Sequence, residues 1–292
     1  FYNRRFYFGG KMMAINFKQI RQMQGLTLKE AASGICSIQM LSRWENGTGN
    51  MDFEKALKLL ERVNITSSEY VHLASLGDTD QLSAELQKAW EQKDHTLIKK
   101  IARNSLEEFH LTSNNLALNY GAIACGLYHR LTKVNLLEID EQNALNKELS
   151  EITVWGQENI SLFFNTIQVL SPKMIFQISA QLIENLDFAK QAGSDTFYFA
   201  TTTLFEAVIA LLISNNSAYA ANILRQLNHF DFPQRETMLI IGRKFLNSLI
   251  DWQEPQNEQS ILKIIDFLLD MGLTMQARNF LQVYKTVRKV KN

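Results

Sequence analysis

Residues 38–46 carry four polar side chains at the spacing of a single helix face. Gln39, Ser42, Arg43 and Asn46 recur at intervals of three and four positions, so a helix places them side by side. An amide, a hydroxyl and a guanidinium are the groups that read base edges and hold phosphates in duplex DNA. A solvated helix face shows the same pattern, so the interpretation depends on the elements around it.

The flanking residues predict that this face belongs to a compact set of short helices. Gly25 and Gly47 each follow a helical stretch and favour its end. Thr27 and Glu30 have the spacing of a capping box, and Ser37 is suited to cap the third helix. The expected helices span 14–24, with Ile15, Ile20 and Met23 as its apolar positions, then 28–33, 38–46, 52–62 and 67–74. A helix-turn-helix arrangement of this kind can lay its third helix in the major groove of DNA.

The segment 37–47 reads Ser-Ile-Gln-Met-Leu-Ser-Arg-Trp-Glu-Asn-Gly. It resembles the XRE-type helix-turn-helix of the lambda and 434 repressor group, and within that group the Rgg/GadR/MutR regulators of Gram-positive bacteria. Their pattern is Ser-x-Ser-Gln-Leu-Ser-Arg-Phe-Glu-x-Gly. Two departures stand out, because Gln39 and Met40 replace a Ser-Gln pair and Trp44 replaces Phe. The resemblance implies a sequence-specific DNA-binding domain.

The same resemblance implies that Arg21 and Glu45 form an ion pair that joins the first helix to the end of the third. We assign contacts with DNA to polar residues in and around the third helix: Lys29, Ser37, Gln39, Ser42, Arg43, Asn46 and Thr48. Residues 13–74 contain seven Lys or Arg and six Asp or Glu, so one module has little net charge with which to attract phosphates. We therefore expect a homodimer on a pseudo-palindromic operator in double-stranded DNA, with two recognition helices about 34 Å apart.

The composition favours a nearly all-helical protein of two domains. Of 292 residues, 46% are hydrophobic and only 3 are proline, so long helices can run without a break. The formal net charge is zero, which excludes a polycation that binds nucleic acid by bulk attraction. Two cysteines, Cys36 and Cys125, suit a reducing cytoplasm and form no disulfide framework. No apolar run reaches the length of about 18 residues that a membrane-spanning helix needs.

We expect a helix-turn-helix domain over 13–74, a linker over 75–80 and a helical-repeat domain over 81–292. The predicted helices of the last domain span 81–92, 95–109, 113–131, 141–153, 157–170, 172–191, 196–213, 216–228, 233–251, 258–271 and 273–288. Consecutive helices with short connections pack antiparallel, and repeated pairs of this length predict a solenoid similar to tetratricopeptide repeats. No strict consensus repeat is visible.

Residues 1–8 show neither helical nor strand periodicity, and we assign 1–12 to a separate N-terminal extension. One hypothesis is that translation starts at Met12 or Met13, which makes the preceding residues an upstream or tag-like extension. The alternative is an arm that touches DNA through Arg4 and Arg5.

A second resemblance lies in residues 155–172. Trp-Gly-Gln-Glu-Asn-Ile-Ser-Leu-Phe-Phe-Asn-Thr, followed by Ser171 and Pro172, is similar to the start of the C-terminal domain of Rgg proteins. The resemblance implies a receptor for a short, re-imported signalling peptide that docks on the concave face of the repeats, as in quorum sensing. We assign candidate peptide contacts to Phe164, Asn165, Tyr198, Thr202, Arg225 and Arg235. Pairing of Asn165 within the fold, and a core role for the face of Tyr198, Thr202, Phe205 and Ile209, are the alternatives.

The chain shows no pattern of catalytic chemistry. Its five histidines lack the spacing of a zinc motif, and there is no glycine-rich phosphate loop or nucleophile elbow. We predict no enzyme activity, no catalytic or metal site and no cofactor. The preferred interpretation is a cytoplasmic, peptide-controlled transcriptional regulator. The alternatives are a peptide-independent dimeric repressor of the same fold and a helical-repeat adaptor that binds other proteins.

Overall fold

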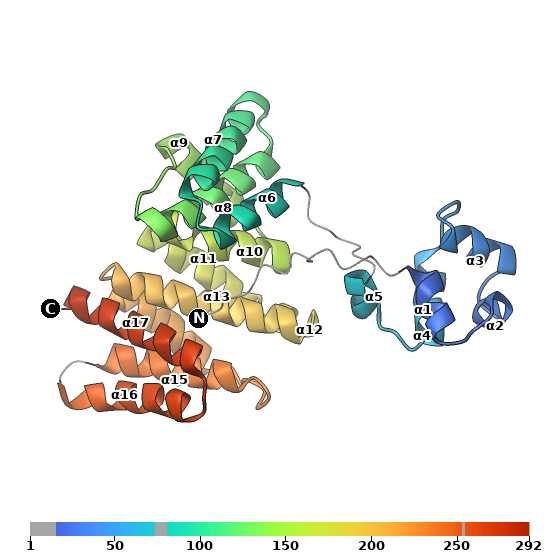
Figure 1. Cartoon of the computed structure of the whole chain (residues 1–292). Coiled ribbons are helices and arrows are strands. Elements are labelled where there is room, and N and C mark those ends of the chain that lie inside the picture. The colour runs from blue at the N-terminus through green and yellow to red at the C-terminus, as the bar shows by residue number, and fades with distance from the viewer. Residues whose placement is uncertain (1–15, 74–80, 253–254, 292) are drawn as a thin grey trace. The chain divides into compact units, whose positions relative to one another are not determined.

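The computed structural model describes residues 16–73, 81–252 and 255–291, and these residues form an all-α fold (Figure 1). The chain falls into two compact units that divide between Gln87 and Lys88, within the sixth helix. The expected linker over 75–80 and the expected extension over 1–12 lie outside the described residues.

The first unit contains a compact helix-turn-helix domain, as predicted. Its helices are α1 (Phe17–Met23), α2 (Leu28–Ala32), α3 (Ile38–Glu45), α4 (Phe53–Arg62) and α5 (Ser67–Leu73). Its buried core consists of Phe17, Ile20, Ala31, Ala32, Leu41, Leu59, Leu60 and Val63. The ring of Trp44 packs beside this core, with its centroid 5.1 Å from that of Phe17 and 6.4 Å from that of Tyr70. The Trp-for-Phe departure therefore keeps an aromatic ring against the core.

Local capping signals fix the ends of these helices. Thr27 caps α2 through its hydroxyl, which accepts a hydrogen bond from the Glu30 N–H, and the Glu30 carboxylate accepts one from the Thr27 N–H in return. The Thr27 hydroxyl and N–H together hold the pKa of Glu30 below its usual range. Gly25 and Gly47 both have φ of 70°, a conformation that favours glycine after a helix. The predicted capping box is confirmed.

The prediction for the first helix was partly wrong. Met23 is 80% exposed, whereas Phe17 is buried. The buried positions of α1 are Phe17, Ile20 and Arg21. The charged residue Arg21 is therefore buried on a face where the periodicity predicted apolar residues. Ile15 lies outside the described residues.

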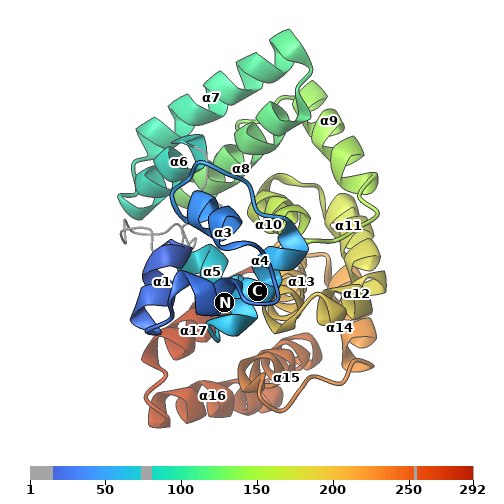
Figure 2. The same ribbon diagram turned by 90° about the vertical axis from the view of Figure 1, so that its right-hand side faces the viewer.

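The second unit begins within α6 and is built from helices that follow an arc (Figure 2). They are α6 (Gln81–Glu91), α7 (His95–Thr112), α8 (Asn115–Thr132), α9 (Ile139–Ser150), α10 (Gln157–Thr166), α11 (Pro172–Glu184), α12 (Leu186–Gln191), α13 (Ser194–Ile213), α14 (Ser217–Asn228), α15 (Thr237–Asp251), α16 (Pro255–Asp270) and α17 (Thr274–Lys291). Helices α8, α10 and α13 lie on the inner side of the arc, and α7, α9, α11 and α14 lie on the outer side. Many neighbours in sequence pack on one another, such as α7 on α8 and α13 on α14, whereas α10 packs on α8 and α13.

Two predicted helices are interrupted. The helix expected over 157–170 ends at Thr166 and continues as a 3₁₀ turn over Ile167–Val169. The Thr166 hydroxyl donates to the Leu162 carbonyl at 2.8 Å, and such side-chain bonds compete with the helical pattern. The helix expected over 172–191 divides at Asn185, whose side-chain amide donates to the Gln181 carbonyl at 3.0 Å.

Helix α13 is the central helix of the second unit. Among the described residues it alone has the length and apolar composition of a membrane span, although 83% of its apolar window is buried inside the protein. The prediction that no apolar run reaches this length is therefore wrong for α13. It packs against α10, α11, α12, α14, α15 and α17, and this burial accounts for its apolar composition.

Candidate nucleic-acid interface

Helix α3 presents a polar face to solvent. Gln39, Arg43 and Asn46 are exposed and Ser42 is half-buried, while Leu41 on the opposite side is fully buried. The Ser37 hydroxyl accepts a hydrogen bond from the Met40 N–H at 3.1 Å and so caps the helix. The face therefore stands on a helix whose start and inner side are both fixed.

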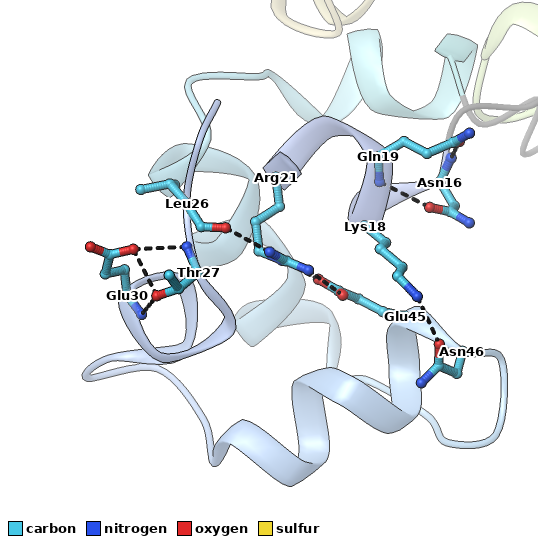
Figure 3. A network of polar contacts seen from close by, with 9 residues as sticks. All are labelled: Asn16, Lys18, Gln19, Arg21, Leu26, Thr27, Glu30, Glu45 and Asn46. Carbon is cyan, nitrogen blue, oxygen red and sulfur yellow. Dashed lines mark hydrogen bonds and ion pairs between the residues drawn. The ribbon is translucent and has the colours of Figure 1, made fainter. Parts of the chain in front are cut away.

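A buried ion pair anchors the far end of α3 (Figure 3). The guanidinium of Arg21 donates from Nε and from NH2 to the two carboxylate oxygens of Glu45, at 2.7 and 2.9 Å. Its NH1 group donates to the Leu26 carbonyl at 2.6 Å. The hydrogen bond with Glu45 raises the pKa of Arg21 against the opposing effect of burial. Because every partner lies on a different segment, the pair holds α1, the turn before α2 and α3 together.

Lys18 extends the polar surface beyond α3. Its ammonium group donates to the Asn46 side-chain oxygen at 3.3 Å (Figure 3). This contact brings a cation from α1 to the end of the recognition helix. Sequence reasoning missed Lys18, because the lysine is 28 residues from Asn46 along the chain.

The other candidate DNA contacts lie around α3. Lys29 is exposed on α2. Thr48 is exposed after α3, where its hydroxyl donates to the Arg43 carbonyl at 3.3 Å and closes the turn. Both stay predictions as contacts with DNA.

Two apolar side chains on α3 are also open to solvent. Ile38 is 45% exposed and Met40 is 36% exposed. The sequence prediction left both out of the interface. Their position in the sequence could have indicated a place in the interface, because they stand on either side of Gln39 in the first turn of α3.

In the second unit, Phe164 and Asn165 lie where three inner helices meet. The Arg130 guanidinium of α8 donates to the Phe164 carbonyl at 2.9 Å and lies 4.7 Å above the centre of the Phe164 ring. That ring packs beside Phe199 of α13 at 5.7 Å. Asn165 is 2% exposed, and its amide donates to the Ser161 carbonyl one turn earlier at 2.9 Å. The NH₂ group of the Asn165 side chain is therefore paired within the fold.

The remaining candidate peptide contacts do not all gather there. Tyr198 is half-buried on α13, and the Thr202 hydroxyl bonds back to the Tyr198 carbonyl at 3.0 Å. Phe205 and Ile209, on the same predicted face, are core residues with 1% and 4% exposure. Arg225 is exposed on α14.

Arg235 is also exposed, and it pairs with the neighbouring Glu236 at 3.5 Å. Among the described residues, Arg130 is more buried than either predicted arginine. Sequence reasoning missed Arg130, because the signal for it lies in tertiary packing.

The two cysteines and the possible metal ligands are the other candidates for a functional site. Both cysteines are free, with Cys125 buried and Cys36 half-buried. Within the described parts of the chain, no three His, Cys, Asp or Glu side chains gather as a metal site would require.

Comparison with known proteins places these features in context. The family model of the C-terminal domain of the HTH-type transcriptional regulator Rgg matches residues 81–282, and a helix-turn-helix model matches residues 17–70. The solved SHP pheromone receptor Rgg2 of Streptococcus dysgalactiae is similar, with a TM-score of 0.71 and 14% identity over 93% of this chain and 98% of that one.

Two further solved structures have a similar fold. A protein from Listeria monocytogenes EGD-e gives a TM-score of 0.73 and 15% identity over 94% of this chain and 97% of that one. The PrgX/cCF10 complex gives 0.68 and 15% over 94% and 91%. At these identities the likeness establishes the fold.

Proposed function

The chain belongs to the family of HTH-type transcriptional regulators Rgg, and from that premise we propose that it binds a pseudo-palindromic operator as a cytoplasmic homodimer under the control of a short peptide. The observation that carries the DNA-binding part is the exposed polar face of α3. Gln39 and Arg43 stand on a helix that Ser37 caps and that the Arg21–Glu45 pair anchors. Because the helix that carries them is fixed, little backbone freedom is lost on binding, which favours specific contact with base edges.

The charge balance of the first unit supports a dimer. Residues 13–74 hold seven basic and six acidic side chains, so one module neutralises few phosphates and gains little affinity from released counterions. Two modules about one helical turn apart double the number of contacts and read two half-sites.

The proposed peptide control rests on likeness and on one feature of the second unit. Rgg2 is described as a pheromone receptor, and another similar structure as a bacterial peptide pheromone/receptor complex. In this chain, the Nε atom of Arg130 and the Oδ1 atom of Asn165 are buried without a hydrogen-bond partner among the described residues. Burial lowers the pKa of Arg130, while the negative charge of Glu206 opposes that shift.

A peptide offers what these atoms lack. An unpaired buried donor or acceptor costs about 1–3 kcal/mol, so a ligand that pairs these atoms, once the side chains turn to admit it, gains affinity. A peptide backbone supplies a carbonyl for Arg130 and an N–H group for Asn165, and a carboxylate also suits Arg130. Arg130 is therefore the residue that we add to the predicted peptide contacts, with Phe164 beside it. Binding alters transcription only if the peptide favours one of two arrangements of the dimer.

The DNA-binding part is tested by titrating the purified full chain on its own upstream region at several salt concentrations. We expect a specific complex whose affinity falls steeply as salt rises. Absence of salt-dependent binding supports the adaptor alternative instead.

The peptide part is tested on the same DNA with synthetic peptides encoded by short reading frames next to the gene. We expect one peptide to change operator affinity, and Arg130→Met to raise the peptide concentration required by at least about tenfold. Arg103→Met, at an exposed position of the outer helix α7, is the matched control and should behave as the wild type. Operator binding that no peptide alters supports the peptide-independent repressor.

A further inference from the structure

The recognition helix exposes two apolar side chains at the end that enters the groove. Ile38 is 45% exposed and Met40 is 36% exposed, and both lie in the first turn of α3. Helix-turn-helix domains bring the N-terminal residues of this helix to the base edges. Neither side chain belongs to the core of the domain or to the partly buried apolar residues packed against it.

Their positions border the polar face on both sides. Ile38 precedes Ser42 by one turn, and Met40 precedes Arg43 by three residues, so each apolar group neighbours a polar group of the face. Gln39 lies between them. Any surface that contacts the polar face of α3 therefore also lies close to Ile38 and Met40.

The major groove offers one apolar feature, the C5-methyl group of thymine. Amide and guanidinium groups gain nothing from that methyl, whereas an aliphatic or thioether side chain gains by excluding water from it. We propose that Ile38 and Met40 read thymine methyl groups in the operator, at positions that flank the base pair contacted by Gln39. This inference rests on the proposed DNA-binding function and adds a base preference to it.

The two side chains differ in flexibility. Ile38 is β-branched and has few rotamers in a helix, so it holds its methyl groups in fixed places. Met40 has a flexible, polarisable side chain. We therefore assign the stricter thymine requirement to Ile38 and the looser one to Met40.

The test replaces thymine by deoxyuridine, which removes only the C5-methyl group, at each position of the operator in turn. We expect wild-type affinity to fall about fourfold per half-site at the position that Ile38 contacts, the value of one buried methyl-sized group. Ile38→Ala should bind thymine and uracil operators equally at that position. Ile38→Val, which keeps a branched methyl group, should retain part of the preference. Met40→Ala should abolish a smaller preference at a second position.

Met23→Ala is the matched control. Met23 is 80% exposed in the same domain but lies on α1, so its removal should leave every thymine preference intact. The helical content of each variant, measured by circular dichroism, excludes unfolding as the cause of any loss. The proposal is overturned if wild-type protein binds every uracil operator as tightly as the thymine operator, or if the same loss persists in Ile38→Ala and Met40→Ala. Absence of a specific complex on the unmodified operator overturns the DNA-binding function itself, which is a separate outcome.

Discussion

Gly126 of helix α8 lies directly against the backbone of Asn165 in α10. A Cβ atom added at Gly126 would stand 1.8 Å from the Asn165 carbonyl oxygen, well inside the distance at which atoms repel. Arg130 follows Gly126 by one turn on the same helix and reaches the Phe164 carbonyl. The close approach of the two helices at Gly126 thus places the guanidinium group of Arg130 beside Phe164.

Gly126→Ala should therefore destabilise the second unit. Alanine normally stabilises a helix by about 1 kcal/mol relative to glycine, but here the added methyl meets backbone, and overpacking typically costs about 1–3 kcal/mol. Urea unfolding of the full chain measures the difference. Gly121→Ala is the comparison on the same helix, because its methyl would meet the side chain of Leu106 at 2.7 Å, and a side chain shifts more easily than the backbone that Gly126 meets. Equal stability of the two variants would contradict the assigned role of Gly126.

The Arg21–Glu45 pair predicts a second effect on stability. Glu45→Ala leaves the guanidinium of Arg21, only 6% exposed, without its charged partner. Breaking a buried pair in this way costs about 3–5 kcal/mol, enough to unfold a small domain. Hydrogen exchange over residues 17–70 should show loss of protection, while the second unit keeps its own. Glu45→Gln, which retains hydrogen-bonding capacity, should lie between wild type and Glu45→Ala.

Arg43 should affect binding without affecting stability. Its side chain is exposed and projects from α3, so Arg43→Ala leaves no buried group unpaired. We expect operator affinity to fall by about 1–3 kcal/mol per subunit, with the fold intact. Lys147→Ala is the charge-matched control, because Lys147 is exposed in the second unit and only weakly paired with Glu151, at 3.9 Å. A normally binding Arg43→Ala variant would refute the assignment of α3 as the recognition helix.

Much of the helix-turn-helix could be predicted because its signals are local. Thr27, Glu30 and Ser37 act within three residues of their own positions, and such contacts need no tertiary partner. The Arg21–Glu45 pair spans 24 residues, and only resemblance to a known pattern suggested it.

Features that depend on packing could not be predicted in the same way. The contacts of Gly126 with Asn165 and of Arg130 with Phe164 join residues that are more than 30 positions apart. Sequence periodicity gives the inward face of each helix but not which partner it meets. For the same reason, the periodicity of α13 left a core role open for the face that carries Tyr198 and Thr202, and the burial of Phe205 and Ile209 favours that role for this part of the helix.

The buried thiol of Cys125 predicts how stability changes at high pH. Burial, assisted by the charge of Glu141, raises the pKa of Cys125 to about 12, whereas a thiol in an unfolded chain titrates near 8.5. Between these values the unfolded chain releases a proton that the folded protein keeps, so the free energy of unfolding falls as pH rises. The limiting slope is about 1.4 kcal/mol per pH unit. Wild-type protein should thus lose stability more steeply than Cys125→Ala in urea unfolding between pH 8.5 and about 10.5. Cys36→Ala, which removes a half-buried thiol, should change that slope less, and parallel curves for wild type and Cys125→Ala would mean that Cys125 ionises freely in the folded state.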